Sequence, residues 1–268
     1  MGTTITMPSN QVLGSAQNIP KGIDAKKIAY VTGGMGGIGT AICQKLFRQG
    51  FLVIAGCSAR RDFSAWLAQQ KELGFEFEIS VGDVTDWNSV VETFSQVKQY
   101  YGNPDVLINN AGLTRDTIFR KMMLDDWLHV INTNLNSLFY TTKQVIEGMI
   151  ERKFGRIINI SSVNGQKGQF GQTNYSASKA GMHGFTMALA QELAVKGITV
   201  NTVSPGYVGT EMVKAMPHEV LDKVVAQIPV RRLGLPEEIA SIVGWLASDD
   251  AAFTTGADFS INGGLYMS

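Results

Sequence analysis

The stretch IAYVTGGMGGIGT, residues 28–40, decides the fold of this chain. Its first five residues form a continuous apolar run of β type, and the glycine-rich turn after them leads into a helical pattern. Glycines let a backbone turn sharply and approach a ligand, and a helix N-terminus offers unpaired N–H groups with a partial positive charge. The stretch therefore predicts a strand, a turn and a helix arranged to hold a pyrophosphate. The alternative is an ordinary tight turn between a strand and a helix.

Beyond this stretch, short apolar runs of β type alternate with longer helical patterns, which is typical of βα units around a parallel sheet. The expected strands are 28–32, 51–55, 75–81, 106–109, 156–161, 199–204 and 258–261. The expected helices are 37–49, 61–73, 87–101, 123–152, 172–195 and 236–248. The pattern predicts an α/β protein with a single-domain Rossmann fold, in which a doubly wound parallel sheet of about seven strands carries helices on both faces. A ligand should bind outside the carboxyl ends of the strands.

Composition narrows the possible partners and compartments. The 23 basic and 23 acidic residues give a formal net charge of zero, which indicates neither a nucleic-acid nor a membrane-surface partner. Cys43 and Cys57 form no metal-binding or disulfide pattern, so we expect no metal site and a cytoplasmic protein. Residues 1–26 are polar and lack the apolar region of a signal peptide, so we expect a flexible N-terminal extension before a domain at 27–268.

Four strand ends carry candidate cofactor contacts. The first offers Gly33, Met35, Gly36, Gly37, Ile38 and Gly39. The second strand ends without the acidic residue that NAD sites use to bind the ribose, and Ser58, Arg60 and Arg61 follow instead. Two guanidinium groups suit a 2′-phosphate, so the pattern predicts NADP(H); a solvated helix start is the alternative.

Two further turns follow the third and fourth expected strands. Gly82, Asp83 and Val84 come after the third, where a carboxylate can accept a hydrogen bond from adenine. Asn110, Ala111 and Gly112 come after the fourth, where small residues permit close backbone approach. Either turn alone is also explained by the turn preferences of Asn, Asp and Gly. Together, on the predicted binding edge, they indicate a floor for the cofactor.

Tyr175 and Lys179 lie four positions apart on one face of an expected helix, and Tyr175 follows Ser162 by thirteen positions. An ammonium near a phenol favours its ionised form, so we expect Lys179 to lower the pKa of Tyr175 and make it a proton donor and acceptor near neutral pH. An ordinary pair on a helix surface is the alternative for this motif alone.

Taken together, these motifs resemble the short-chain dehydrogenase/reductase family over almost all of 27–268. The matching motifs, in the family's order and spacing, are Thr32-Gly33-x-x-x-Gly37-Ile38-Gly39, Asn109-Asn110-Ala111-Gly112, Asn134, Ser162, Tyr175-x-x-x-Lys179 and Pro205-Gly206. Within the family, the runs at 33–37, 161–175 and 204–207 are most similar to NADPH-dependent acetoacetyl-CoA reductases of polyhydroxybutyrate synthesis. The acyl carrier protein reductases of fatty acid synthesis are the nearest alternative. The N-terminal extension departs from the family pattern.

The resemblance implies a catalytic role for four residues. Tyr175 would protonate the keto oxygen of a 3-oxoacyl thioester while hydride passes from the nicotinamide, and Ser162 would hydrogen-bond the substrate carbonyl. Lys179 would lower the pKa of Tyr175 and hold the nicotinamide ribose, and Asn134 would hold a water that connects Lys179 to solvent. A polar residue satisfied locally within its helix is the alternative for Asn134.

The resemblance also implies the remaining contacts. Further cofactor contacts would come from Pro205, Gly206, Tyr207 and Val208, besides Tyr175 and Lys179. An acyl-CoA substrate would meet Asp116, Ser162, Gln169, Phe170, Gln172 and Tyr207, under a lid at 208–235. Because coenzyme A carries phosphates, its candidate contacts are the basic residues Arg115, Arg120, Lys121 and Lys214; an ordinary solvated face is the alternative for any single one. The family implies a homotetramer, and we assign His183 a packing role rather than a catalytic one. A protein that binds NADPH without catalysis is the hypothesis from another class.

Overall fold

The computed structural model describes residues 26–214 and 217–267, and within them one parallel sheet of seven strands forms the centre. Its strand order is β3-β2-β1-β4-β5-β6-β7. The strands are β1 (Ile28–Thr32), β2 (Leu52–Cys57), β3 (Glu78–Val81), β4 (Val106–Asn109), β5 (Gly155–Ile160), β6 (Ile198–Pro205) and β7 (Asp258–Ile261). The predicted doubly wound Rossmann-like fold is therefore confirmed. Residues 1–25 of the expected extension lie outside the described residues.

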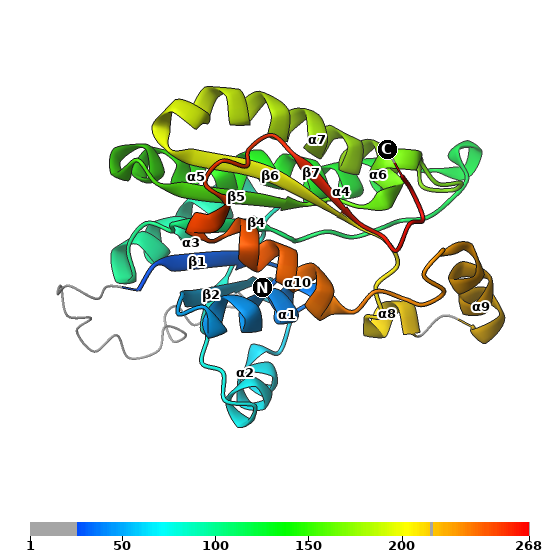
Figure 1. Ribbon diagram of the computed structural model, residues 1–268, viewed down its shortest axis with the longest axis horizontal. Helices are drawn as coiled ribbons and strands as arrows, with labels where there is room; N and C mark the ends of the chain where they lie inside the picture. Colours follow the sequence, from blue (N-terminus) through cyan, green and yellow to red (C-terminus); the bar gives the residue numbers. More distant parts are fainter. Residues whose placement is uncertain (1–25, 215–216, 268) are drawn as a thin grey trace, which may run out of the picture.

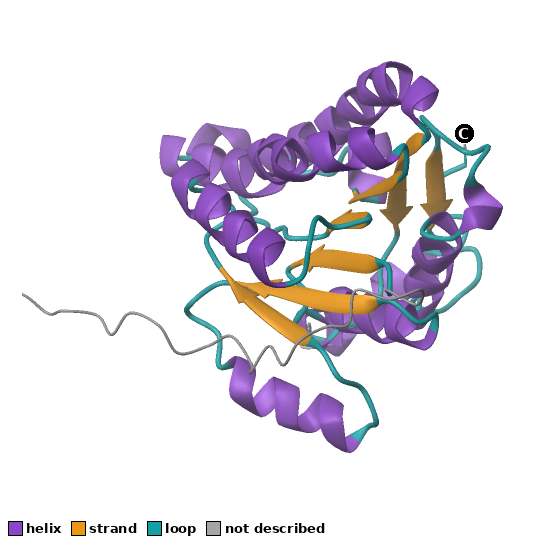
Figure 2. Cartoon of the chain, turned by 90° about the vertical axis from the view of Figure 1, so that its left-hand side faces the viewer, coloured by secondary structure: helices purple, strands orange, loops and turns teal. Residues whose placement is uncertain are grey.

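Helices cover both faces of the sheet (Figures 1 and 2). One face carries α1 (Gly37–Arg48) and α10 (Pro236–Leu246), with α2 (Phe63–Glu72) beside them. The other carries α3 (Trp87–Tyr100), α5 (Ser137–Arg152) and α7 (Thr173–Leu193). The remaining helices are α4 (Leu124–Ile131), α6 (Val163–Lys167), α8 (Glu211–Lys214) and α9 (His218–Gln227).

Strand β1 shows why the apolar runs are continuous. Ala29 and Val31 join the core under α1 and α10, whereas Ile28 and Tyr30 join the core under α3, α5 and α7. Successive strand residues point to opposite faces, so covering a strand on both sides favours apolar residues at successive positions. The continuous apolar run after residue 27 therefore reflects a strand that is covered by helices on both faces.

The order of strands reverses between β1 and β4. From β1 the chain proceeds outward through β2 and β3, and from β4 it proceeds the other way through β5, β6 and β7. The loops that leave the carboxyl ends of β1 and β4 therefore diverge, and a crevice opens between them. This crevice is where the predicted cofactor residues belong.

Two expected elements differ from the structure. The strand expected from Phe75 begins only at Glu78, because the backbone N–H of Phe75 is bonded to Gln70 in the turn that ends α2. The long helix expected at 123–152 is interrupted, since a π-helical turn over Asn132–Asn136 separates α4 from α5. An extra residue in such a turn re-aims the side chains around it, and here it directs Asn134 inward.

The segment predicted as a lid, 208–235, contains α8 and α9, and residues 215 and 216 lie outside the described part of the chain. No residue of α9 is buried, and the helix stands away from the sheet in Figure 1. Its role as a lid stays a prediction. In the described residues, no helix combines the length and apolar character needed to cross a lipid bilayer.

Candidate active site

The turns after β1 and β4 are joined by hydrogen bonds. The hydroxyl oxygen of Thr32 accepts from the backbone N–H groups of Asn110 and Ala111, each at 2.9 Å. In return, the side-chain amide of Asn110 donates to the carbonyls of Thr32 at 3.0 Å and Gly33 at 3.1 Å. The two loops are thereby fixed relative to each other at the mouth of the crevice.

A cavity of about 720 Å³ lies beside these turns. This volume is within the range of cofactor and small-molecule sites in proteins. Predicted cofactor residues that line it are Gly33, Met35, Gly36, Gly37, Ile38, Gly39, Ser58, Arg60, Arg61, Gly82, Asp83, Val84, Asn110, Ala111 and Gly112. Those outside its lining are Tyr175, Lys179, Pro205, Gly206, Tyr207 and Val208. Of these, Tyr207 lines a smaller cavity of about 220 Å³.

The glycine turn fits the backbone approach that a dinucleotide needs. Gly33 has φ 62°, and a Cβ atom on Gly39 would overlap the carbonyl oxygen of Gly33. Gly36 caps α1 without a side-chain hydrogen bond, and the first turn of α1 holds no acidic residue. Thr133 adds an unpaired hydroxyl, buried at the cavity wall. These features leave a cradle of N–H groups that suits a pyrophosphate.

The residues that follow β2 suit a bound phosphate better than the free hydroxyl groups of a ribose. Ser58, Arg60 and Arg61 are exposed and line the cavity. The first carboxylate after the strand is Asp62, which is engaged as the cap of α2 and accepts from the N–H groups of Ser64 and Ala65. Two guanidinium groups therefore face the cavity without a competing carboxylate in its lining at this strand end.

Sequence reasoning missed about half of the cavity wall. The additional lining residues are Tyr30, Thr32, Gly56, Cys57, Thr85, Val90, Thr93, Phe94, Leu113, His129, Thr133, Thr141, Thr210 and Glu211. Most lie on helix faces or inside strands, where a sequence pattern indicates only burial. Thr210 was within reach of prediction, because it lies two positions after the predicted residues 205–208.

Tyr175, Lys179 and Ser162 meet beside this cavity, although they come from different elements. Lys179 Nζ lies 5.6 Å from the ring centroid of Tyr175, one turn away on α7, and donates to the carbonyl of Ile160 at 2.8 Å. Ser162 follows β5, caps α6 by accepting from Asn164 N–H at 3.1 Å, and hydrogen-bonds the phenol of Tyr175. A hydroxyl, a phenol and an ammonium thus share one site.

The expected direction of the Tyr175 pKa is wrong. Burial raises the pKa of this phenol; the hydrogen bond from Ser162 acts against the rise, and the nearby carboxylate of Asp116 adds to it. Burial also lowers the pKa of Lys179 to about 7. The sequence argument treated the lysine as permanently charged, but a side chain 3% exposed cannot keep that charge at no cost. Near neutral pH, the phenol therefore keeps its proton.

Asn134 is fully buried in the π-helical turn. Its amide oxygen accepts from Leu113 N–H at 2.9 Å, and its amide nitrogen donates to the Leu113 carbonyl at 3.0 Å and to Ser178 Oγ at 3.1 Å. Its partners lie outside its own helix, so the side chain fastens the loop after β4 to α7. A Cβ atom on Gly112 would lie 3.3 Å from this amide oxygen and 3.4 Å from Lys179 Nζ.

The predicted substrate residues lie on two loops that the structure ties together. Gln172 Nε2 donates to Asp116 Oδ2 at 2.8 Å and Gln172 Oε1 accepts from Asn164 at 2.9 Å. Gln169 is bonded to Lys167, and Phe170 is 86% exposed. Tyr207 lies on a third segment, where burial, followed by the charge of Asp116, raises the pKa of its phenol.

His183 has a more specific place than packing alone. Ser161 Oγ donates to the carbonyl of Lys179 at 2.9 Å, which uses its only hydrogen. His183 Nε2, 3.0 Å from the same oxygen, must therefore carry a hydrogen and donate it. Asp258 Oδ2 lies 3.6 Å from this nitrogen. The imidazole thus braces the backbone of Lys179 through Ser161, a link that no spacing in the sequence reveals.

A dinucleotide cavity that adjoins a proton-bearing tyrosine is what an enzyme needs to oxidise alcohols or reduce carbonyls with a nicotinamide cofactor. A family model described as short chain dehydrogenase matches residues 27–220, and the chain belongs to this family of oxidoreductases. Among the described residues, no cluster of His, Cys, Asp and Glu is placed to hold a metal ion.

Curated relatives are similar over most of the chain. An acetoacetyl-CoA reductase of Cupriavidus necator is 67% identical over 90% of this chain and 99% of the relative. Nodulation protein G of Azospirillum brasilense is 52% identical over 90% of this chain and 98% of its own. A 3-oxoacyl-[acyl-carrier-protein] reductase of Pseudomonas aeruginosa is 46% identical over the same two shares.

The buried ammonium leads to a test of stability. Lys179→Met should stabilise the cofactor-free protein at pH 6, where the folded wild type must bury a charge. The pKa of Lys179 is about 7 in the folded protein and 10.5 in the unfolded chain. Between these two pH values the unfolded chain binds more protons, so the stability of the wild type rises with pH there. The advantage of the variant should be on the order of a few kcal/mol at pH 6 and should shrink toward pH 10. Urea unfolding at several pH values measures it, and a variant less stable at pH 6 would contradict the assignment.

Proposed function

We propose that this chain reduces acetoacetyl-CoA to (3R)-3-hydroxybutyryl-CoA with NADPH, as polyhydroxybutyrate synthesis requires. The observation that carries the proposal is the meeting of Ser162, Tyr175 and Lys179 beside the glycine-lined cavity, in a chain 67% identical to an acetoacetyl-CoA reductase. NADPH, when bound, supplies the hydride for the keto carbon. The residues of the chain orient the substrate and move the proton.

Tyr175 is the proton donor in this proposal. Its raised pKa keeps the phenol protonated at neutral pH, which is the form that a reduction consumes. Ser162 hydrogen-bonds the phenol and holds the keto oxygen beside it, stabilising the negative charge that develops there. A phenol with a raised pKa is a weak acid, so in this proposal it gives its proton to the substrate oxygen as hydride transfer makes that oxygen negative.

Lys179 restores the proton. A pKa of about 7 lets its ammonium lose and regain a proton near neutral pH, and its nitrogen lies close to the Tyr175 ring. Gly112 borders both this nitrogen and the amide oxygen of Asn134, and its missing side chain leaves space there. We propose that protons reach Lys179 past Gly112, with Asn134 holding the loop open.

The cofactor preference rests on the end of β2. Arg60 and Arg61 at the cavity wall suit the 2′-phosphate that distinguishes NADPH from NADH, and Asp62 is occupied in capping α2. We place Ser58 beside them as a further phosphate contact.

Replacing both arginines tests this preference. Arg60→Ala/Arg61→Ala should raise the KM for NADPH by about 10-fold or more, because charge-assisted bonds to the phosphate are lost, and should leave the KM for NADH nearly unchanged. Steady-state kinetics with each cofactor measures both values. Lys71→Ala, a basic side chain exposed on α2, serves as the matched control. Equal or better use of NADH by the wild type would refute the preference.

A direct assay tests the activity. The wild type should oxidise NADPH in the presence of acetoacetyl-CoA and yield the (3R) alcohol in chiral analysis. Tyr175→Phe should lower kcat by about 10²- to 10⁴-fold while NADPH still binds, measured by fluorescence titration, because only the proton donor is removed. Near-normal turnover of this variant would exclude Tyr175 as the donor.

The second candidate function is reduction of 3-oxoacyl groups on an acyl carrier protein, supported by the 46% identical relative of that name. Turnover on the carrier-protein thioester well above that on the CoA ester would favour it. A protein that binds NADPH without catalysis is disfavoured because Ser162, Tyr175 and Lys179 are all present. NADPH binding without turnover on either thioester would favour it.

We further propose a cytoplasmic homotetramer. Apolar side chains are exposed on adjacent helices of one face: Leu124, Leu128, Phe139 and Met187 are 69%, 43%, 53% and 53% exposed. Such a surface on α4, α5 and α7 suits burial against another copy. Light scattering should give four times the chain mass of 29.1 kDa, and replacing Phe139 and Met187 by Ser should lower it. A monomeric wild type would overturn the proposal.

A further inference from the structure

A short 3₁₀ turn, Phe119–Lys121, follows the predicted substrate residue Asp116 by three positions. Its backbone is fixed, since Lys121 N–H donates to Ile118 and Met122 N–H donates to Phe119. Phe119 is nevertheless 71% exposed. A fixed turn that holds an aromatic ring in water, close to a predicted substrate residue, presents that ring to a ligand.

A second exposed ring comes from the opposite loop. Phe170 is 86% exposed, and its neighbour Gly171 accepts from Thr117 N–H at 2.8 Å. The residue after Gly171, Gln172, is bonded to the residue before Thr117, Asp116. These two bonds hold the segments around Phe119 and Phe170 next to each other. A flat aromatic group is the kind of ligand that two such rings stack against.

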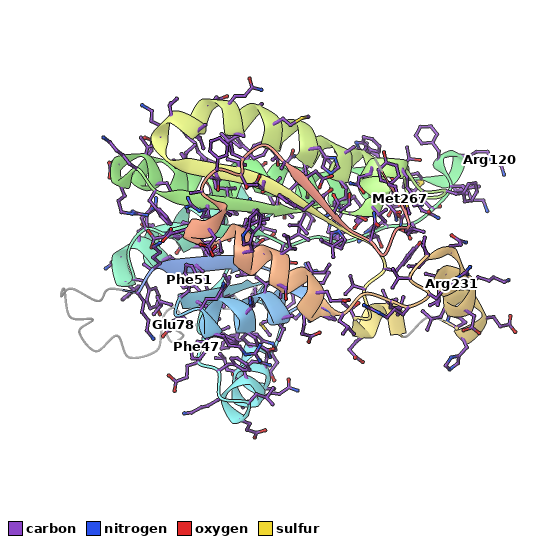
Figure 3. All side chains as sticks on the ribbon, viewed as in Figure 1. Phe47, Phe51, Glu78, Arg120, Arg231 and Met267 are labelled. Carbon is purple, nitrogen blue, oxygen red and sulfur yellow. The ribbon has the colours of Figure 1, made fainter. Side chains whose placement is uncertain are left out.

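Two cations near these rings are available to a ligand. Arg120 and Lys121 are exposed and make no side-chain ion pair or hydrogen bond with other described residues, and Figure 3 shows Arg120 at the outer end of its loop. Arg115, which the sequence analysis grouped with them, is instead paired with Asp126 at 3.3 Å. The nearby acid Asp125 lies on α4 and forms no ion pair with either cation within the described part of the chain.

We propose that Phe119, Phe170, Arg120 and Lys121 form a subsite for the 3′-phosphorylated adenosine end of coenzyme A. The subsite rests on the proposed function and deepens it. The rings stack on adenine and the two cations bind its phosphates, while the acyl end reaches inward past Asp116 to Tyr175. A carrier protein presents the same thioester without the nucleotide, so this subsite selects for the CoA ester.

Comparing two thioester substrates separates recognition of the nucleotide from the chemical step. Phe119→Ala should raise the KM for acetoacetyl-CoA about tenfold, the loss of one base–aromatic contact, and should leave kinetics with the acetoacetyl thioester of N-acetylcysteamine unchanged. Phe253→Ala, which removes a fully exposed ring elsewhere, is the matched control. Equal losses on both thioesters, or no loss on either, would overturn the subsite. A wild type that reduces neither would instead refute the proposed function.

A nucleotide probe tests the cations. At saturating NADPH, adenosine 3′,5′-bisphosphate should inhibit the wild type competitively against acetoacetyl-CoA, and Arg120→Ala/Lys121→Ala should weaken this inhibition about tenfold or more. Competition with NADPH alone would place the probe in the cofactor cavity and overturn the proposal. An equal loss by this variant on a carrier-protein thioester would mean that the cations dock a protein, which also overturns it.

Discussion

The hydroxyl of Thr32 is the interaction on which the site depends. It is 3% exposed at the end of β1, accepts from two backbone N–H groups of the turn after β4, and lies 3.3 Å from the carbonyl of Ile108 as its donor. Strand order reverses between β1 and β4, so the two turns would otherwise diverge without a link. The bond network sets the distance between the glycine turn and Gly112. The glycine turn that suits the cofactor and the loop that borders Lys179 are therefore fixed to each other.

Burial of the tyrosine and lysine has a consequence for the chemistry. Removal from water favours the neutral form of each group, so it moves the two pKa values in opposite directions. Tyr175 therefore keeps its proton near neutral pH, whereas Lys179 can gain or lose one there. The ammonium has a carbonyl partner, Ile160, but no carboxylate among the causes of its shift. Burial of Lys179 lowers the stability of the folded protein but gives the side chain a pKa near neutral pH.

The sequence predicted the sheet and the binding edge because both depend on local patterns. Short runs of β type, most of them continuously apolar, marked the strands, and glycines marked the turn that must approach a ligand. It did not predict the π-helical turn at Asn132–Asn136, where no Gly or Pro signals a break. It gave the wrong direction for the Tyr175 pKa, because desolvation depends on what packs over α7. Spacing shows that two side chains share a helix face but not how much water reaches them.

Chemistry and recognition are placed on different parts of the molecule. Tyr175 and Lys179 lie on α7 and Ser162 lies at the end of β5, whereas the predicted substrate residues other than Ser162 lie on loops.

The two parts are nevertheless connected, since Asn164 bonds Ser162 through its backbone and Gln172 through its side chain. Gln172 in turn bonds Asp116, so the loops that carry the predicted substrate contacts are linked to Ser162. A catalytic group of this kind serves any 3-oxoacyl thioester, and it cannot by itself distinguish coenzyme A from a carrier protein. That choice must lie with groups that touch the part of the substrate far from the ketone, and the exposed rings and cations beyond Asp116 are the groups so placed.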